Sequence, residues 1–399
     1  MNMADGFKTG DSGGERVWSP LELAEVKTGP RLGQIRRGKG LSGRKRMRVT
    51  DRAECFHVMS RIVNGEFLLG GIEKEAFRRM MWRMGRFAGI EILTYAIMDN
   101  HFHILLKVPE QAKWLKRFEG DGGEEHFFEH LSLVYSKAFI AQLRGEVLEL
   151  RARDEEAAVQ ELLARFNRRF CDLSLFVKEL KERFSRWYNK QNERRGTLWM
   201  ERFKSVMVES GQALQAMAGY IDLNPVRAGI VDDPAMYEWS GYGEATGGSK
   251  RAQRGLCKVL GVAQDCWNGR AHPYYRKWLY AEGYAPEADP QEGQVTSRPG
   301  VAGSRAGTTK RRGFSKEQVE KVMDHEVASP ILPILPILLI RKRMRSFSHG
   351  IAIGSEDYVK GVAARYRERF DRQKTRKAKR LKGDALSRGQ ATSIYLMRE

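Results

Sequence analysis

Two adjacent apolar segments, residues 90–97 and 101–108, constrain the fold of this chain more than any other feature. Each is typical of a β-strand, and the short link between them carries Asp99 and Asn100, which favour a tight turn. Pro109 ends the second segment. We therefore predict a β-hairpin whose second strand begins at residue 101.

The second strand of this hairpin begins with His101-Phe-His103. Side chains alternate between the two faces of a strand, so both histidines should point the same way and Phe102 the opposite way. Two imidazoles on one strand face can converge on a single cation, and imidazole suits several divalent metals. Taken alone, the spacing is equally compatible with a structural pair of histidines.

Elements on both sides of the hairpin indicate the fold class. Residues 54–63 predict a strand, and residues 73–88 predict a helix with an apolar stripe that stops at Gly89. Further helices are predicted at 173–192 and 211–223, with a strand at 197–208 between them. This order, β-α-β-β-insertion-α-β-α, predicts an α+β fold, a ferredoxin-like antiparallel sheet with helices packed on one face.

The predicted strand at 197–208 alternates aromatic and basic residues. Trp199 and Phe203 are interleaved with Arg202 and Lys204. Such a strand suits single-stranded nucleic acid, whose bases stack on aromatic rings while its phosphates pair with cations. An ordinary half-buried strand explains the pattern equally well.

Changes in composition divide the chain into five parts. A helical, heavily charged insertion separates the hairpin from the next predicted helix. In it, His126 and His130 are four residues apart and could face a metal together or serve packing. The predicted organisation is a basic flexible arm (1–50), an α+β domain (51–245) with the insertion at about 110–172, a linker region (246–312) and a helical basic C-terminal extension (313–399).

The charge of the chain points to a polyanionic partner. Its 399 residues have a formal net charge of +20, which favours nucleic acid ahead of a membrane surface. The four cysteines are scattered and contain no CxxC pair, so neither a zinc ribbon nor a disulfide framework is indicated. The apolar run at 328–340 is short and interrupted by prolines, and the N-terminus is polar. We expect a soluble cytoplasmic protein.

A tyrosine and an asparagine downstream complete a candidate site. Tyr220 and Asn224 are four residues apart and should share one helix face. A tyrosine hydroxyl is a weak nucleophile that needs assistance, and a divalent metal could supply it by polarising a phosphodiester. Two imidazoles and one amide oxygen would form a three-ligand metal site. The alternatives are a core tyrosine and an asparagine that caps a short helix at Pro225.

Several motifs, in order along the chain, resemble one family. His101-Phe-His103, preceded by Met98-Asp-Asn, resembles the HUH motif (His, hydrophobic, His) of single-tyrosine transposases. The segments 196–204, 220–229 and 237–242 resemble the downstream blocks of REP-associated tyrosine transposases. The similarity covers about residues 50–245, without the insertion.

The resemblance implies a metal-dependent DNA transposase that acts on single-stranded or hairpin DNA. His101, His103 and Asn224 would bind Mg²⁺ or Mn²⁺, and Tyr220 would attack the phosphate to give a 5′-phosphotyrosine. Arg202, Lys204 and Arg227 are expected to contact DNA. The enzyme would work in association with the bacterial nucleoid, as a monomer or a dimer.

Two other functions remain open from the sequence. One is a hairpin-DNA-binding regulator that does not cleave, as in a domesticated transposase. The other is a metal nuclease that uses activated water in place of tyrosine.

Overall fold

The computed structural model describes Val49, residues 51–283, 313–324, 350–366, 379–380 and 395–398. The predictions for the basic arm at 1–50, apart from Val49, and for the apolar run at 328–340 therefore lie outside the described residues. Among the residues described, no helix is both long enough and apolar enough to cross a membrane.

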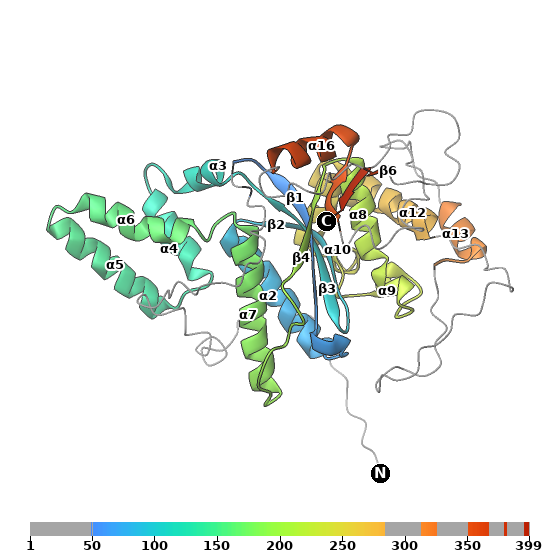
Figure 1. Ribbon diagram of the computed structural model, residues 1–399, viewed down its shortest axis with the longest axis horizontal. Coiled ribbons are helices and arrows are strands. Elements are labelled where there is room, and N and C mark those ends of the chain that lie inside the picture. The colour runs from blue at the N-terminus through green and yellow to red at the C-terminus, as the bar shows by residue number, and fades with distance from the viewer. Residues whose placement is uncertain are drawn as a thin grey trace, which may run out of the picture.

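A mixed β-sheet forms the centre of the structure (Figure 1). Its strand order within the described ranges is β2-β3-β1-β4-β5-β7-β6, and the first three junctions are all antiparallel. The pair β4–β5 is parallel. The strands are β1 (Glu54–Arg61), β2 (Glu91–Ile97), β3 (His101–Val108), β4 (Lys204–Val208), β5 (Gly350–Gly354), β6 (Lys379–Arg380) and β7 (Tyr395–Arg398).

Helices cover both faces of this sheet, so the expectation of helices on one face is wrong. Alternate residues of β3 divide between two cores: Phe102 and Ile104 join one, and Leu105 joins the other. The first core is closed by α2 (Gly71–Ala88) and α7 (Leu173–Gln191), which lie side by side (Figure 1). The second is closed by α8 (Gln212–Asp222), α10 (Gly241–Thr246), α11 (Lys250–Leu260) and α12 (His272–Gly283).

The predicted hairpin is present, with its second strand starting at His101. The chain folds back at Asp99 and Asn100, where the amide N–H of Met98 donates to the carbonyl of His101 over 2.8 Å. The α2 helix ends as expected, because Gly89 adopts φ 67°, a left-handed conformation that glycine tolerates without strain.

The insertion forms four helices at the end of the hairpin away from the turn. They are α3 (Gln111–Leu115), α4 (Gly123–Ser132), α5 (Lys137–Ala152) and α6 (Glu156–Asn167), with a short 3₁₀ helix η2 (Lys116–Phe118). The insertion packs on the C-terminal end of α2, where the amide of Cys171 donates to the carbonyl of Ala88 over 2.7 Å. In Figure 1, α5 and α6 extend away from the sheet on the side opposite α9 (Asn224–Arg227).

The linker predicted at 246–312 is wrong for its first part. Residues 250–260 and 272–283 form α11 and α12, and Leu256, Val259, Tyr275 and Leu279 of these helices are buried in the second core. The linker prediction rests on the Gly-, Pro-, Ser- and Gln-rich composition after about residue 285, although the chain before it carries helical apolar stripes. Residues 284–312 lie outside the part described.

The C-terminal extension is not purely helical. It contributes β5, whose residues pair with β4 at Met207 and Val208, together with α13 (Lys316–Met323) and α16 (Glu356–Arg365). Ala352 and Ile353 are fully buried on opposite faces of the sheet. This segment is thus part of the central sheet.

The strand predicted at 197–208 forms only over its second half, β4. Before it, the indole Nε1 of Trp199 donates to Ser185 Oγ over 2.8 Å, which ties the chain to α7. Trp199 also packs on Phe77 and Phe102, and Phe203 is buried in the same core. These aromatic rings are packing residues, which supports the half-buried strand over a stacking surface for bases.

Candidate functional site

The two motif histidines lie on the sheet face that α8 covers. His103 is buried and His101 is half-buried, and their ring centroids are 5.0 Å apart. Phe102 points to the opposite core, as the strand spacing predicts. The pair stands at the start of β3, close to the turn that joins it to β2.

The surroundings of His101 define which ring nitrogen carries its proton. Asn100 Nδ2 donates to the carbonyl of Gly65 over 2.9 Å, which identifies Oδ1 as the amide atom that faces His101. His101 Nδ1 lies 2.6 Å from this oxygen, an acceptor, so Nδ1 is the protonated nitrogen. The Nε2 atom of His101 therefore keeps its lone pair for a cation or a proton.

A third histidine, absent from the sequence-based site, completes a cluster. His57 of β1 is buried, and its Nε2 lies 2.8 Å from His103 Nδ1. The two rings are stacked with centroids 5.1 Å apart. The register of β1 against β3 could have revealed it, because Met59 pairs with His103 and His57 is two residues along the same face.

The histidines are held in their neutral form. Burial, with Arg61 acting in the same direction, lowers the pKa of His101 to about 4. Burial also lowers the pKa of His103 well below its usual value, assisted by its two neighbouring imidazoles and by Arg61 and Arg227. A neutral imidazole is the form that binds a metal ion.

Tyr220 lies directly against this cluster. It occupies the last turn of α8, and its ring is edge-on to His103 at 5.7 Å and to His57 at 6.0 Å between centroids. Only 6% of the residue is exposed. The structure thus brings Tyr220 and the histidine pair together although 117 positions of sequence separate Tyr220 from His103.

Asn224 begins α9, the short helix that follows Tyr220. Its Nδ2 donates to the carbonyls of Tyr220 and Ile221 over 3.0 and 3.3 Å. The amide nitrogen therefore satisfies the carbonyl end of α8, which leaves Oδ1 as the atom available to a cation. The predicted cap at the start of the helix at Pro225 is wrong, because no side chain caps the start of α9 and Asn224 instead bonds to the end of α8. The ligand role of Asn224 stays a prediction.

One of the three predicted DNA contacts lies in the site itself. The guanidinium of Arg227 stands over the Tyr220 ring at 5.2 Å, and its Nη1 donates to the Tyr220 carbonyl over 3.1 Å. Arg61 adds a second cation, since it pairs with His101 across β1 and β3 and acts on the pKa of both motif histidines. The rim of the cluster is positive.

The other two predicted DNA contacts belong to the segment that leads into β4. Lys204 starts β4 opposite Met59, and its Nζ forms an ion pair with Glu201 at 3.2 Å. Arg202 is exposed in the segment before β4. Lys204 lies two strands from His103 on the same sheet face, because Met59 of β1 pairs with both residues.

A buried carboxyl fixes the helix that carries Tyr220. Asp222 is fully buried and accepts hydrogen bonds from Thr94 Oγ1 at 2.7 Å and from the Tyr275 hydroxyl at 2.6 Å. It also accepts from the amide of Tyr242. Burial raises the pKa of Asp222 to about 7. These bonds tie α8 to β2, α10 and α12, so the position of Tyr220 is set by three other elements.

The donor atoms in the cluster form a small set that fits a divalent metal. Within the described ranges, no group of three or more His, Cys, Asp or Glu side chains could hold a metal ion. Two neutral imidazoles and one amide oxygen form a smaller set, in which the second nitrogen of each histidine is hydrogen-bonded to Asn100 or His57. Such outer hydrogen bonds are typical of metal-binding histidines.

Part of this chain is similar to a solved structure. A search of protein-family models found no match, and neither did a search of curated proteins. The solved structure is described as "Structure of the REP associates tyrosine transposase bound to a REP hairpin". The match has 14% sequence identity and a TM-score of 0.32, and it covers 52% of this chain and 87% of the other.

Proposed function

We propose that this protein is a metal-dependent DNA transposase that cleaves and rejoins single-stranded or hairpin DNA through Tyr220. The observation that carries the proposal is the contact of Tyr220 with His103, whose neighbour His101 has a free Nε2 lone pair. The motifs that suggested this family from the sequence supply residues to the same cluster, within a β1-α2-β2-β3-α7-β4 order compatible with a ferredoxin-like core.

His101, His103 and Asn224 would hold the metal, Mg²⁺ or Mn²⁺. When bound, a divalent cation supplies Lewis-acid polarisation of a phosphodiester and stabilises the charge that develops on it. The protein residues make two further contributions. The imidazoles stay neutral, and Arg227 and Arg61 attract the phosphate.

The proposed chemistry balances without an external energy source. The Tyr220 oxygen loses its proton and forms a bond to phosphorus, while the bond from phosphorus to the 3′ oxygen breaks. The 3′ oxygen takes up a proton, which gives a 5′-phosphotyrosine and a free 3′-OH. Rejoining reverses these steps, with a 3′-OH as the attacking group and the tyrosine as the leaving group.

A covalent adduct tests the proposal. Incubation with hairpin DNA and Mn²⁺, followed by denaturing electrophoresis, should show a protein–DNA band that Tyr220→Phe and chelation abolish. Free 5′-phosphate ends without an adduct would indicate a nuclease that uses water. An adduct that persists in Tyr220→Phe would exclude Tyr220 as the nucleophile.

One observation favours a second candidate, a hairpin-DNA-binding regulator that does not cleave. Only 6% of Tyr220 is exposed, and burial restricts the access of a substrate phosphate to a side chain. The regulator predicts metal-independent binding that Tyr220→Phe leaves unchanged, with a steep dependence on salt. The same adduct assay separates the two functions.

A further inference from the structure

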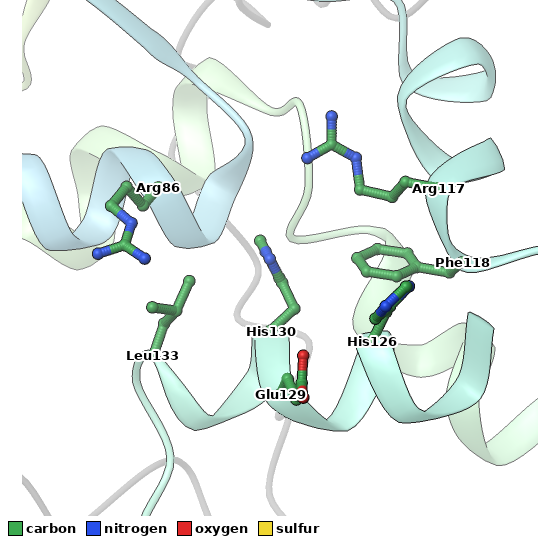
Figure 2. Close-up of a pocket in the computed structure, with 7 residues that line it drawn as sticks. All are labelled: Arg86, Arg117, Phe118, His126, Glu129, His130 and Leu133. Atoms are coloured by element: carbon green, nitrogen blue, oxygen red, sulfur yellow. The ribbon is translucent and has the colours of Figure 1, made fainter. Parts of the chain in front are cut away.

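A second basic site lies where the insertion meets the C-terminal end of α2. A recess of about 330 Å³ opens there between Arg86 of α2, Arg117 and Phe118 of η2, and His126 of α4 (Figure 2). It uses none of the residues around Tyr220. The predicted DNA contacts do not explain it either.

The recess and the histidine cluster lie at opposite ends of the hairpin. His101 stands at the start of β3, beside the turn, whereas the insertion follows Val108 at the other end of the strand. The eight residues of β3 span about 26 Å, from a rise of about 3.3 Å per residue. The recess is therefore spatially separate from the histidine cluster.

Two arginines give the recess its charge. In the part of the chain that the structure describes, neither Arg86 nor Arg117 forms an ion pair with an acid. Arg117 is held in place, because its Nε donates to the Trp114 carbonyl at 3.0 Å and its guanidinium lies 4.1 Å from the Trp114 ring. Figure 2 shows the two guanidinium groups on either side of His130. Paired guanidinium groups match the oxygens of a phosphate.

A hydrogen bond and ring contacts hold His130 at the floor of the recess. His130 Nε2 lies 2.8 Å from the carbonyl of Phe87, an acceptor, so this nitrogen donates and the ring is committed to packing. The ring also contacts Trp114 and Phe118, with centroids 5.2 and 5.4 Å apart. The pKa of His130 is lowered, first by burial and also by the nearby Arg117 and Arg86, while the bond to Phe87 opposes the shift.

The walls of the recess suit one segment of a polymeric ligand better than a small molecule. Arg86, Arg117 and His126 are exposed, and the Phe118 ring is half-buried beside His126 (Figure 2). A small molecule bound specifically is usually enclosed by apolar walls, whereas a polymer is held by cations and open rings along its length. Glu129, also exposed, is the one acid in the lining and opposes an anion.

We infer that this recess binds a backbone phosphate of a nucleic-acid strand, at a distance from the phosphate that reacts. The inference rests on the proposed function for its ligand, DNA. Arg86 and Arg117 bind the phosphate from two sides, and Phe118 and His126 offer ring surfaces to the adjoining base. The insertion thus adds a second DNA contact to the catalytic domain.

Charge variants of the full-length protein test the inference by DNA affinity. The double variant Arg86→Ala/Arg117→Ala should weaken binding of a hairpin with a long single-stranded flank by about tenfold and lower the salt slope by about 1–2. Glu129→Gln should tighten binding. The control Arg153→Ala/Arg165→Ala removes the same charge from exposed arginines elsewhere on the insertion and should change the affinity less than about twofold.

The outcomes separate this inference from the proposed function. Equal losses in the recess variant and the control would overturn the inference, even if the wild type forms the Tyr220 adduct. A specific loss without any adduct in the wild type would leave the recess assigned and remove the cleavage proposal. Competition by millimolar inorganic phosphate as effective as competition by unlabelled DNA would show a free-phosphate site and overturn the nucleic-acid assignment.

Discussion

His57 Nε2 and His103 Nδ1 lie 2.8 Å apart between two buried, stacked rings. If His103 donates this bond, its Nε2 keeps a lone pair that faces away from His57. The same hydrogen bond fixes the orientation of the His103 ring against Tyr220. His57 thereby acts on the proposed metal site through His103, as a positioning residue.

Replacement of His57 should weaken metal binding without removing a ligand. We expect His57→Phe to lower Mn²⁺ affinity about 10- to 100-fold, because the ring remains but the acceptor for His103 is lost. His57→Gln, which keeps an acceptor oxygen, should retain much of the affinity. Electron paramagnetic resonance titration of Mn²⁺ measures this independently of DNA cleavage. His126→Phe at an exposed histidine is the control, and unchanged affinity in a folded His57→Phe would refute the role.

The arginine over Tyr220 should matter more than the predicted DNA contact that lies away from it. Arg227→Ala should reduce adduct formation at least about tenfold, because a cation beside the reacting phosphate is lost. Arg202→Ala, at an exposed residue with no contact to Tyr220, should retain nearly full rate. Single-turnover rates with saturating DNA provide the comparison. Equal effects of both substitutions would show that Arg227 only adds to general DNA affinity.

A buried glutamate makes stability depend on pH. Glu244 accepts hydrogen bonds from Tyr95, from Trp82 Nε1 at 3.0 Å and from Ser249 Oγ at 2.9 Å, and it pairs with Arg251 at 2.9 Å. Burial opposes ionisation, but these partners prevail and lower the pKa of Glu244 below its usual value of 4.5. A carboxyl whose pKa is lowered on folding stabilises the fold above about pH 4.5 and loses this contribution as the pH falls through its folded value.

Glu244→Gln should therefore cost about 1–3 kcal/mol at pH 7, since an amide presents donors where only an acceptor fits. The difference from wild type should shrink as the pH falls below about 4.5. Urea unfolding at pH 7, 5 and 3.5 measures both effects. A difference that stays constant over this range would mean that the ionised carboxylate contributes nothing beyond shape.

Two helical glycines should respond in opposite directions to alanine. A Cβ on Gly255 of α11 would lie 2.4 Å from the Leu93 carbonyl oxygen and 2.8 Å from that of Ile92, so the helix would have to move off β2. We expect Gly255→Ala to destabilise by about 1–3 kcal/mol. Gly145 of α5 has nothing within 4 Å of its Cβ position, and Gly145→Ala should stabilise by about 0.5–1 kcal/mol. Thermal unfolding of both variants checks the pair.

Local sequence patterns predict the hairpin and the helices beside it because their apolar residues recur with a clear period. The same patterns place His101 and His103 on one face, but they do not reveal His57, whose neighbours on β1 carry no motif. Its role arises from the pairing of β1 with β3, a contact between residues about 45 positions apart. Sequence periodicity contains no information on such a register.

For a related reason, the sequence did not predict that helices cover both faces of the sheet. Leu256 and Val259 show that α11 is amphipathic, but nothing local shows that its apolar side belongs on β2. Likewise Gly350-Ile-Ala-Ile-Gly354 is too short to be recognised as a strand without its partner β4. The positions of α11 and β5 both depend on contacts with segments distant in the sequence.

The place of β5 beside β4 has a consequence for folding during synthesis. Strands β1 to β4 are complete when the ribosome has passed residue 208, yet the neighbour that covers the free edge of β4 begins at residue 350. At about 5–20 residues per second, the edge stays open for on the order of ten seconds. During that time β4 offers unpaired backbone groups to other nascent chains. Slow translation between these two strands should therefore favour aggregation, and the edge stays open long after Tyr220, Asn224 and Arg227 have been made.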